Sequence, residues 1–201
     1  IRDASGNVYE AQFEDAASAR ILRYNSSATL LASVFNRQAM NQLAFDGTDL
    51  YVAANGGGFP ATYELKSFST DLATSNWTQN ILNGRAGGIA IDSNGDLVVS
   101  NPTSTTKYNI EKRSPSTGAL SSTIVSSRTI PTGSSSTIVG HVAVGPNDEI
   151  AVTAGNSVEM FTALGVHIFT SAVGAGGTVK ARHVAIGPDG TVYVCGDRAE
   201  G

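Results

Sequence analysis

The sequence has little charge, a single cysteine and no long apolar run. Its 201 residues contain 13 Lys and Arg and 17 Asp and Glu, for a net charge of -4. Such a chain lacks the basic patch that phosphate backbones require, so no nucleic-acid partner is expected. The apolar runs fall far short of the ~18 residues that cross a bilayer, so no membrane insertion is expected. The lone Cys195 cannot form an internal disulfide and leaves the redox compartment open.

What remains is a composition suited to strands and turns. Hydrophobic residues make up 41% of the chain, enough for a core, while Ser, Thr, Asn and Gly dominate the rest. A weakly charged surface rich in Ser and Thr is common on secreted or virion-exposed proteins, so an extracellular or surface-exposed location is expected. Asn25 and Asn76 begin glycosylation sequons, which matter only if the chain passes through a glycosylating compartment.

The chain repeats a short hairpin five times. The segments begin at Ile1, Leu43, Ile89, Val142 and Val184, and the first strand residues after their turns are spaced by 42, 47, 53 and 42 residues. These intervals fit four short strands per unit. The sequence therefore predicts one all-β repeat domain over residues 1–201, with units at 1–42, 43–88, 89–141, 142–183 and, in part, 184–201.

The turn chemistry predicts the register of each hairpin. Gly187-Pro188-Asp189-Gly190 suits a type I turn with Gly in the left-handed region. The predicted pairs are Ile186 with Val192, Ala185 with Tyr193, Val184 with Val194, His183 with Cys195, Ala90 with Val98, Ala143 with Ala151, and Ala44 with Tyr51. The Ala repeated on the first strand of these four copies predicts that a neighbouring sheet packs closely over it.

Two further strands are expected in each complete unit. The third strands are predicted at 19–25, 62–69, 108–114 and 156–162, and the fourth at 30–35, 77–82, 121–127 and 167–173. The third strands alternate charged with apolar residues, which is typical of partly exposed strands.

Units of this length, with the pattern apolar-Ala-apolar-Asp-x-x-Gly-x-apolar-Tyr-Val-Ala, resemble the NHL and YVTN class of β-propeller repeats. The resemblance implies an all-β propeller of four-stranded antiparallel blades, with about four full units and a partial fifth that a larger ring would continue. The alternative is a solenoid or sandwich built from hairpins. The resemblance concerns the fold alone, because propellers host enzymes, binding platforms and structural parts.

In propellers of this kind, one face collects the residues before each first strand and the loops after each second strand. Those loops are expected to be long and polar, and the face is the predicted ligand-binding site. Its candidate residues are Gln42, Asn101, His141, Arg182, His183 and Asp197.

The runner-up interpretation of this face is a metal site formed by His141 and His183, which occupy the same position in adjacent repeats. Metal-dependent lyases of the propeller class use His at this end of the blade, in a His-Gly-apolar-x-apolar-Asp motif from which this sequence departs. On that alignment the ligand positions are Asn41, Gly87, Gly140 and Arg182, and both histidines fall one place later. A shift of one residue on a strand turns a side chain to the other face, so each His is expected to be a scaffold residue with no metal bound.

Cys195, opposite His183, is likewise predicted to be scaffold rather than a nucleophile, because Thr153 faces His141 in the preceding repeat. These observations favour a non-catalytic binding or structural module of a filament, adhesin or viral appendage, without a cofactor. Its expected partners are other protein subunits that assemble through open blade edges. The first alternative is a lyase or lactonase with one divalent metal ion in the central channel. The second is a carbohydrate-binding propeller, for which Phe59 is the one loop aromatic.

Overall fold

The structure, a computed structural model, describes residues 1–15, 18–36, 40–56, 62–82, 87–131, 139–174 and 179–198. These residues form strands and turns without any helix, and so include no helix that could cross a membrane. Phe59 lies outside the described residues. The sequence predicts one repeat domain, and the described contacts fall into two compact units. Unit 1 comprises residues 1–86 and 115–119, and unit 2 comprises residues 87–114 and 120–201.

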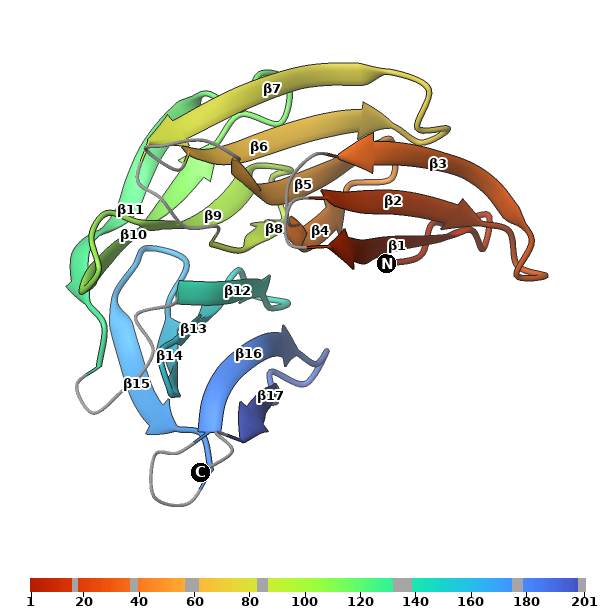
Figure 1. Cartoon of the computed structure of the whole chain (residues 1–201). Helices are drawn as coiled ribbons and strands as arrows, with labels where there is room; N and C mark the ends of the chain where they lie inside the picture. The colour runs from red at the N-terminus through yellow and green to blue at the C-terminus, as the bar shows by residue number, and fades with distance from the viewer. Residues whose placement is uncertain are drawn as a thin grey trace. The chain divides into compact units, whose positions relative to one another are not determined.

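Unit 1 contains two antiparallel sheets (Figure 1). The first has three strands, β1 (Val8–Asp15), β2 (Ser18–Tyr24) and β3 (Leu30–Asn36). Beside β1, where the other sheet of this unit has its first strand, an isolated bridge joins Arg2 to Val8. The second has four strands, β4 (Met40–Phe45), β5 (Asp49–Gly56), β6 (Thr62–Ser69) and β7 (Ser75–Leu82). Tyr9, Ile21, Leu50, Val52 and Phe68 are buried together in the core of this unit.

Unit 2 contains two four-stranded sheets and one two-stranded sheet. The first sheet is β8 (Ile89–Ile91), β9 (Leu97–Pro102), β10 (Lys107–Arg113) and β11 (Leu120–Thr129). The second is β12 (Val139–Val144), β13 (Ile150–Ala154), β14 (Ser157–Phe161) and β15 (His167–Ala172). The third is the hairpin of β16 (Val179–Ile186) and β17 (Val192–Arg198). In every four-stranded sheet, strands that follow one another in the chain are also neighbours in the sheet.

The predicted registers are confirmed in all four hairpins that were aligned by their turns. Ile186 pairs with Val192 and His183 with Cys195, and Ala90, Ala143 and Ala44 pair with Val98, Ala151 and Tyr51. The predicted third and fourth strands are present within two residues of their expected bounds.

Three of these hairpins share a register because they share one turn. In the last hairpin the Gly187 N–H donates to the Thr191 carbonyl at 2.8 Å, and Gly190 takes a φ of +81°. The same bonds close the turns before β9 and β13, where Gly95 has a φ of +84° and Asp148 a φ of 59°. Gly adopts the left-handed backbone conformation of this position most readily, and Asp and Asn come next. Local turn chemistry therefore explains the repeated hairpin.

The repeated Ala of the first strand is covered only where a neighbouring sheet lies over it. Ala44 is buried, and Ala90 and Ala143 are half-buried against hydrophobic clusters of their units. Ala185, at the equivalent place in β16, is exposed.

Two predictions about the loops and strands need correction. The loop after β13 is a two-residue turn, Gly155-Asn156, where a longer polar loop was expected, because Ala154 and Ser157 pair directly. The first strands also begin three to five residues earlier than the repeat alignment placed them, at Met40, Val139 and Val179. Each of these early segments contains an irregularity in its pairing, and that irregularity lies at the candidate site.

Candidate functional site

His141 and His183 come from the first strands of adjacent sheets, β12 and β16, and their rings touch. The two Nδ1 atoms lie 3.0 Å apart, and the ring centroids are 3.9 Å apart at an interplanar angle of 80°. A hydrogen bond at this distance requires one Nδ1 to carry a proton and the other to accept it. His141 is half-buried and His183 is exposed. The structure thus brings together the pair that the sequence singled out.

Arg182 and Asp197 also lie together. The Arg182 Nε donates to an Asp197 carboxylate oxygen at 2.7 Å, and both side chains are substantially exposed. Arg182 belongs to β16 and Asp197 to β17, so the ion pair joins the two strands of one hairpin. An exposed ion pair of this kind contributes little to stability. Because both side chains are exposed, the guanidinium and the carboxylate are accessible to a polar ligand.

The structure does not join the other two candidates to this group, because the described side-chain hydrogen bond of Asn101 goes to Glu111 and Gln42 belongs to unit 1. Asn101 is buried, and its amide donates to Glu111 at 2.7 Å, while Glu111 also accepts two hydrogen bonds from Arg113 at 2.9 and 2.6 Å. Gln42 is half-buried in β4 of unit 1, paired with Ala53. Asn101 thus belongs to a buried polar network in which its members hydrogen-bond to one another.

An irregularity in strand pairing lies at or directly before each candidate residue of the first strands. Pairing skips from Met40 to Gln42 and from Ala181 to His183, and it shifts between Val139 and Val142. The extra residues are Asn41 and Arg182 in the first two strands, and in the third the shift takes in Gly140 and His141. A bulge re-aims the side chains beside it. The expectation that a one-residue offset places His141 and His183 on the opposite face therefore does not follow here, because the strands are not regular at this point.

Two glycines occupy the positions where the lyase motif would carry a metal-binding His. A Cβ added to Gly87 would lie 1.6 Å from the Ser100 carbonyl oxygen, and one added to Gly140 would lie 2.5 Å from the Thr153 hydroxyl. Neither position has room for a side chain. Among the described residues, moreover, no three His, Cys, Asp or Glu side chains gather as metal ligands. The residues present therefore do not fit a metal centre with three or four protein ligands.

A repeated hydroxyl, which the sequence analysis passed over, links the sheets behind this face. The Ser100 hydroxyl accepts from the Gly88 N–H at 2.6 Å and donates to the Gly140 carbonyl at 3.1 Å. Thr153, at the equivalent place in β13, directs its hydroxyl at the Arg182 carbonyl at 3.4 Å. Cys195 occupies the same position in β17. The signal that could have found this contact is the alignment of Ser100, Thr153 and Cys195 in the repeats.

A buried carboxylate forms a second polar network in unit 2. Glu159 is fully buried and accepts hydrogen bonds from the Tyr108 hydroxyl at 2.6 Å, from Arg128 at 2.5 and 2.9 Å and from Thr170 at 3.1 Å. Burial and the adjacent Glu159 charge raise the pKa of Tyr108 far above its usual range. These groups hold β14 against β10 and β11, so they support the site without lining it.

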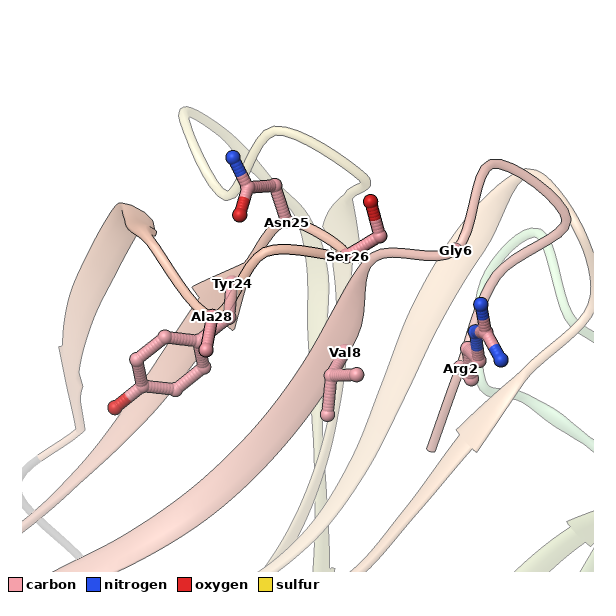
Figure 2. A pocket seen from close by; sticks show the side chains of 7 residues that line it. All are labelled: Arg2, Gly6, Val8, Tyr24, Asn25, Ser26 and Ala28. Atoms are coloured by element: carbon pink, nitrogen blue, oxygen red, sulfur yellow. The ribbon is translucent and has the colours of Figure 1, made fainter.

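Unit 1 has a separate surface pocket of about 450 Å³ between the turn before β1 and the turn after β2 (Figure 2). Among the lining residues, Val8 lies between Tyr24 and Arg2 in the view of Figure 2. The side-chain Oδ1 of Asn25 accepts from the Ser27 and Thr29 N–H groups at 3.0 and 2.9 Å, which fixes the second turn. The lining is mostly apolar, and Arg2 is the positively charged residue in it. The remaining lining residues are Gly6, Ser26 and Ala28.

The repeated antiparallel sheets define the class of fold: this is a β-propeller-type repeat, as the resemblance implied. No protein-family model and no curated protein sequence matches the chain. Similarity to solved structures is clear. A protein of unknown function from Bacteroides caccae superposes with a TM-score of 0.67 and 11% identity, over 94% of this chain and 64% of that one.

Virginiamycin B lyase from Staphylococcus aureus has a TM-score of 0.64 and 12% identity, over 96% of this chain and 61% of the lyase. BamB from Moraxella catarrhalis has a TM-score of 0.56 and 11% identity, over 95% of this chain and 60% of BamB. This chain thus spans less than two thirds of each of these proteins. At such low identities the similarity shows the fold alone.

Proposed function

We propose that this chain is a non-catalytic β-propeller module that binds other protein subunits of an extracellular or surface assembly. The observation that carries the proposal is in unit 2, where the apolar side chains of Ile168 and Phe169 on β15 are exposed by 52% and 39% in the described part of the chain. Large exposed apolar patches mark sites of protein association.

The polar residues of the candidate face support a binding role over a catalytic one. His141 is engaged with His183, Arg182 with Asp197, and Asn101 with Glu111. A general base or nucleophile must reach its substrate with a group that the scaffold leaves available. Contacts of this kind suit a rigid surface that presents side chains in fixed positions, as a binding module requires.

The surface location rests on composition and on one modification site. Asn25 is half-buried and lies on a turn, where two backbone N–H groups donate to its side-chain oxygen and leave the amide nitrogen as the acceptor for a glycan. Asn76 is the poorer acceptor, because its amide nitrogen already donates to Asp49 at 3.0 Å and to Ser67 at 3.1 Å. Expression in a glycosylating host therefore has a clear expected result: occupancy at Asn25 exceeds that at Asn76.

The alternative function is a metal-dependent propeller enzyme of the lyase or lactonase type. One observation favours it: the two imidazole Nδ1 atoms, 3.0 Å apart, could both reach a single divalent cation. Virginiamycin B lyase, to which the fold is similar, is an enzyme by its name. The absence of room at Gly87 and Gly140 weighs against this alternative.

One experiment separates the two functions. The purified chain is examined by light scattering and negative-stain imaging, and metal content is measured on the same sample. The proposed function predicts concentration-dependent assembly without stoichiometric metal, unchanged in a His141→Phe/His183→Phe variant. A monomer that carries about one metal ion per chain, lost in that variant, would refute the proposal and establish the enzyme alternative as the one to pursue.

A further inference from the structure

The strand β7 forms an open edge in the middle of the chain. It is the last strand in the sheet order β4-β5-β6-β7 of unit 1 (Figure 1). Among the described residues its backbone pairs with β6 alone, from Thr62 opposite Leu82 to Phe68 opposite Ser75. The N–H and C=O groups on its other side therefore have no strand to pair with in the described part of the chain.

This edge lacks the features by which proteins keep exposed strands from pairing with one another. The segment SNWTQNIL contains neither a charged residue nor a proline, and its register with β6 is regular from Leu82 to Trp77. The outer strand β11 differs, because its register with β10 shifts three times and Ser127 takes a φ of 51°. Bulges, charges and prolines are the usual protection of an edge, so β11 is protected and β7 is open to pairing.

Contacts within unit 1 hold β7 in place. The centroids of the Trp77 and Tyr51 rings are 6.2 Å apart, and the Trp77 Nε1–H donates to the Pro115 carbonyl at 2.9 Å. Gly118 lies so close to the strand that an added Cβ would be 2.5 Å from the Trp77 ring and 2.9 Å from the Gln79 Cβ. An edge that is already ordered loses little conformational entropy when a second strand pairs with it.

The order of side chains along β7 is complementary to itself. In an antiparallel pairing of two β7 strands centred on Gln79, this residue lies opposite its own copy. Trp77 then lies opposite Ile81 of the second copy, and Thr78 lies opposite Asn80. Residues directly opposite one another in such a pair lie on the same face of the sheet. Two apolar side chains therefore meet on one face, beside the two Gln79 amides, while a hydroxyl meets an amide on the other face.

The charges of the neighbouring strand β6 also suit this pairing. Glu64 lies opposite Asn80, Lys66 lies opposite Thr78, and the two charged side chains form an ion pair at 3.0 Å. The two-fold pairing places Glu64 of one copy in the same row across the joined sheet as Lys66 of the other copy. Opposite charges are thus aligned across the interface and like charges are not, which is the complementarity that a specific interface requires.

We propose that two copies of this chain associate through β7, in a two-fold antiparallel pairing centred on Gln79 that joins their sheets of β4–β7 into one. The interface is isologous, because each copy contributes the same strand. Backbone hydrogen bonds provide its affinity, and the side chains opposite one another determine its register. The inference rests on the proposed function and names one partner of the assembly, which is a second copy of the chain.

The test uses the whole chain, with substitutions at the two-fold axis where one residue meets its own copy. Gln79→Lys and Gln79→Glu each place like charges opposite one another, and each should weaken self-association in sedimentation experiments by about tenfold. An equimolar mixture of the two variants places opposite charges there and should associate at least as tightly as the original chain. Thr123→Lys, at an exposed position of the outer strand β11, is the matched control and should leave self-association unchanged. Circular dichroism verifies that each variant is folded.

The inference is overturned if folded Gln79→Lys self-associates as strongly as the original chain, or if the mixture associates no better than either variant alone. Either result, with self-association of the original chain intact, would retain the proposed assembly role and reject the pairing through β7. An original chain that stays monomeric at every concentration would reject both.

Discussion

Ser100 and Thr153 occupy the same position in successive sheets, and each directs its hydroxyl at a backbone carbonyl of the next sheet's first strand. Ser100 donates to Gly140 at 3.1 Å and Thr153 to Arg182 at 3.4 Å. Ser100 also accepts from the Gly88 N–H. These bonds tie adjacent sheets of unit 2 together next to the bulges that carry His141 and Arg182.

Removing the Ser100 hydroxyl is expected to destabilise the chain more than removing that of Thr153. Ser100→Ala leaves the buried Gly88 N–H without its partner, which costs about 1–3 kcal/mol. Thr153→Val loses longer and weaker bonds and is expected to cost about 1 kcal/mol. Urea unfolding followed by circular dichroism measures both. Equal effects of the two substitutions would contradict this ranking.

The Glu159 network gives a second stability prediction. Tyr108→Phe removes a hydroxyl that donates at 2.6 Å to a fully buried carboxylate, and a hydrogen bond to a charged group contributes about 1.5–3 kcal/mol. The control is Tyr193→Phe, because Tyr193 is 60% exposed, and no change is expected there. Thermal unfolding of the two variants should separate them clearly. Similar midpoints for both would show that the Tyr108 hydroxyl contributes nothing net.

The glycine at the bulge of β12 predicts a rescue. Gly140→Ala places a Cβ 2.5 Å from the Thr153 Oγ1 and is expected to cost about 1–3 kcal/mol, as overpacked positions do. Adding Thr153→Ala removes that atom, and the next neighbour, the Arg182 carbonyl oxygen, is 3.2 Å away. The double variant should regain most of the loss. Gly87→Ala, in contrast, meets the Ser100 backbone and should not be rescued by changing the Ser100 side chain. A double variant no more stable than Gly140→Ala would disprove the steric explanation.

Stability at low pH should depend on Asp148. The Ser93 hydroxyl donates to its carboxylate at 2.5 Å and the Ser93 N–H at 2.8 Å, and these bonds lower the pKa of Asp148. In the unfolded chain the carboxyl titrates near ~3.9, so on acidification the unfolded state binds the proton first. The stabilisation is complete above about pH 5 and is lost as the pH falls through the folded pKa.

Asp148→Asn provides the comparison, because Asn tolerates the left-handed backbone of this turn. The variant should be less stable at neutral pH, and its deficit should shrink as the pH falls below about 4. Urea midpoints of both proteins across this range give the measurement. A deficit that stays constant with pH would rule out the carboxylate as the cause.

Much of the fold follows from the sequence. The turn at Gly187–Gly190 and its copies determines each hairpin register, because a left-handed Gly, Asp or Asn allows one closure of the loop. The alternation of apolar residues then predicts the third and fourth strands. These are local effects, which act over a few residues and repeat wherever the residues repeat.

The candidate site depends on contacts between distant residues. His141 and His183 could be aligned from the repeat, but that their Nδ1 atoms meet depends on bulges that alter the direction of both side chains. The Glu159 network joins residues 51 positions apart, Tyr108 and Glu159, for which no local pattern exists. The sequence by itself determined the repeated hairpins through turn chemistry. Only the tertiary structure decided which side chains meet between sheets and which apolar face remains uncovered, because packing depends on the neighbour that each sheet has.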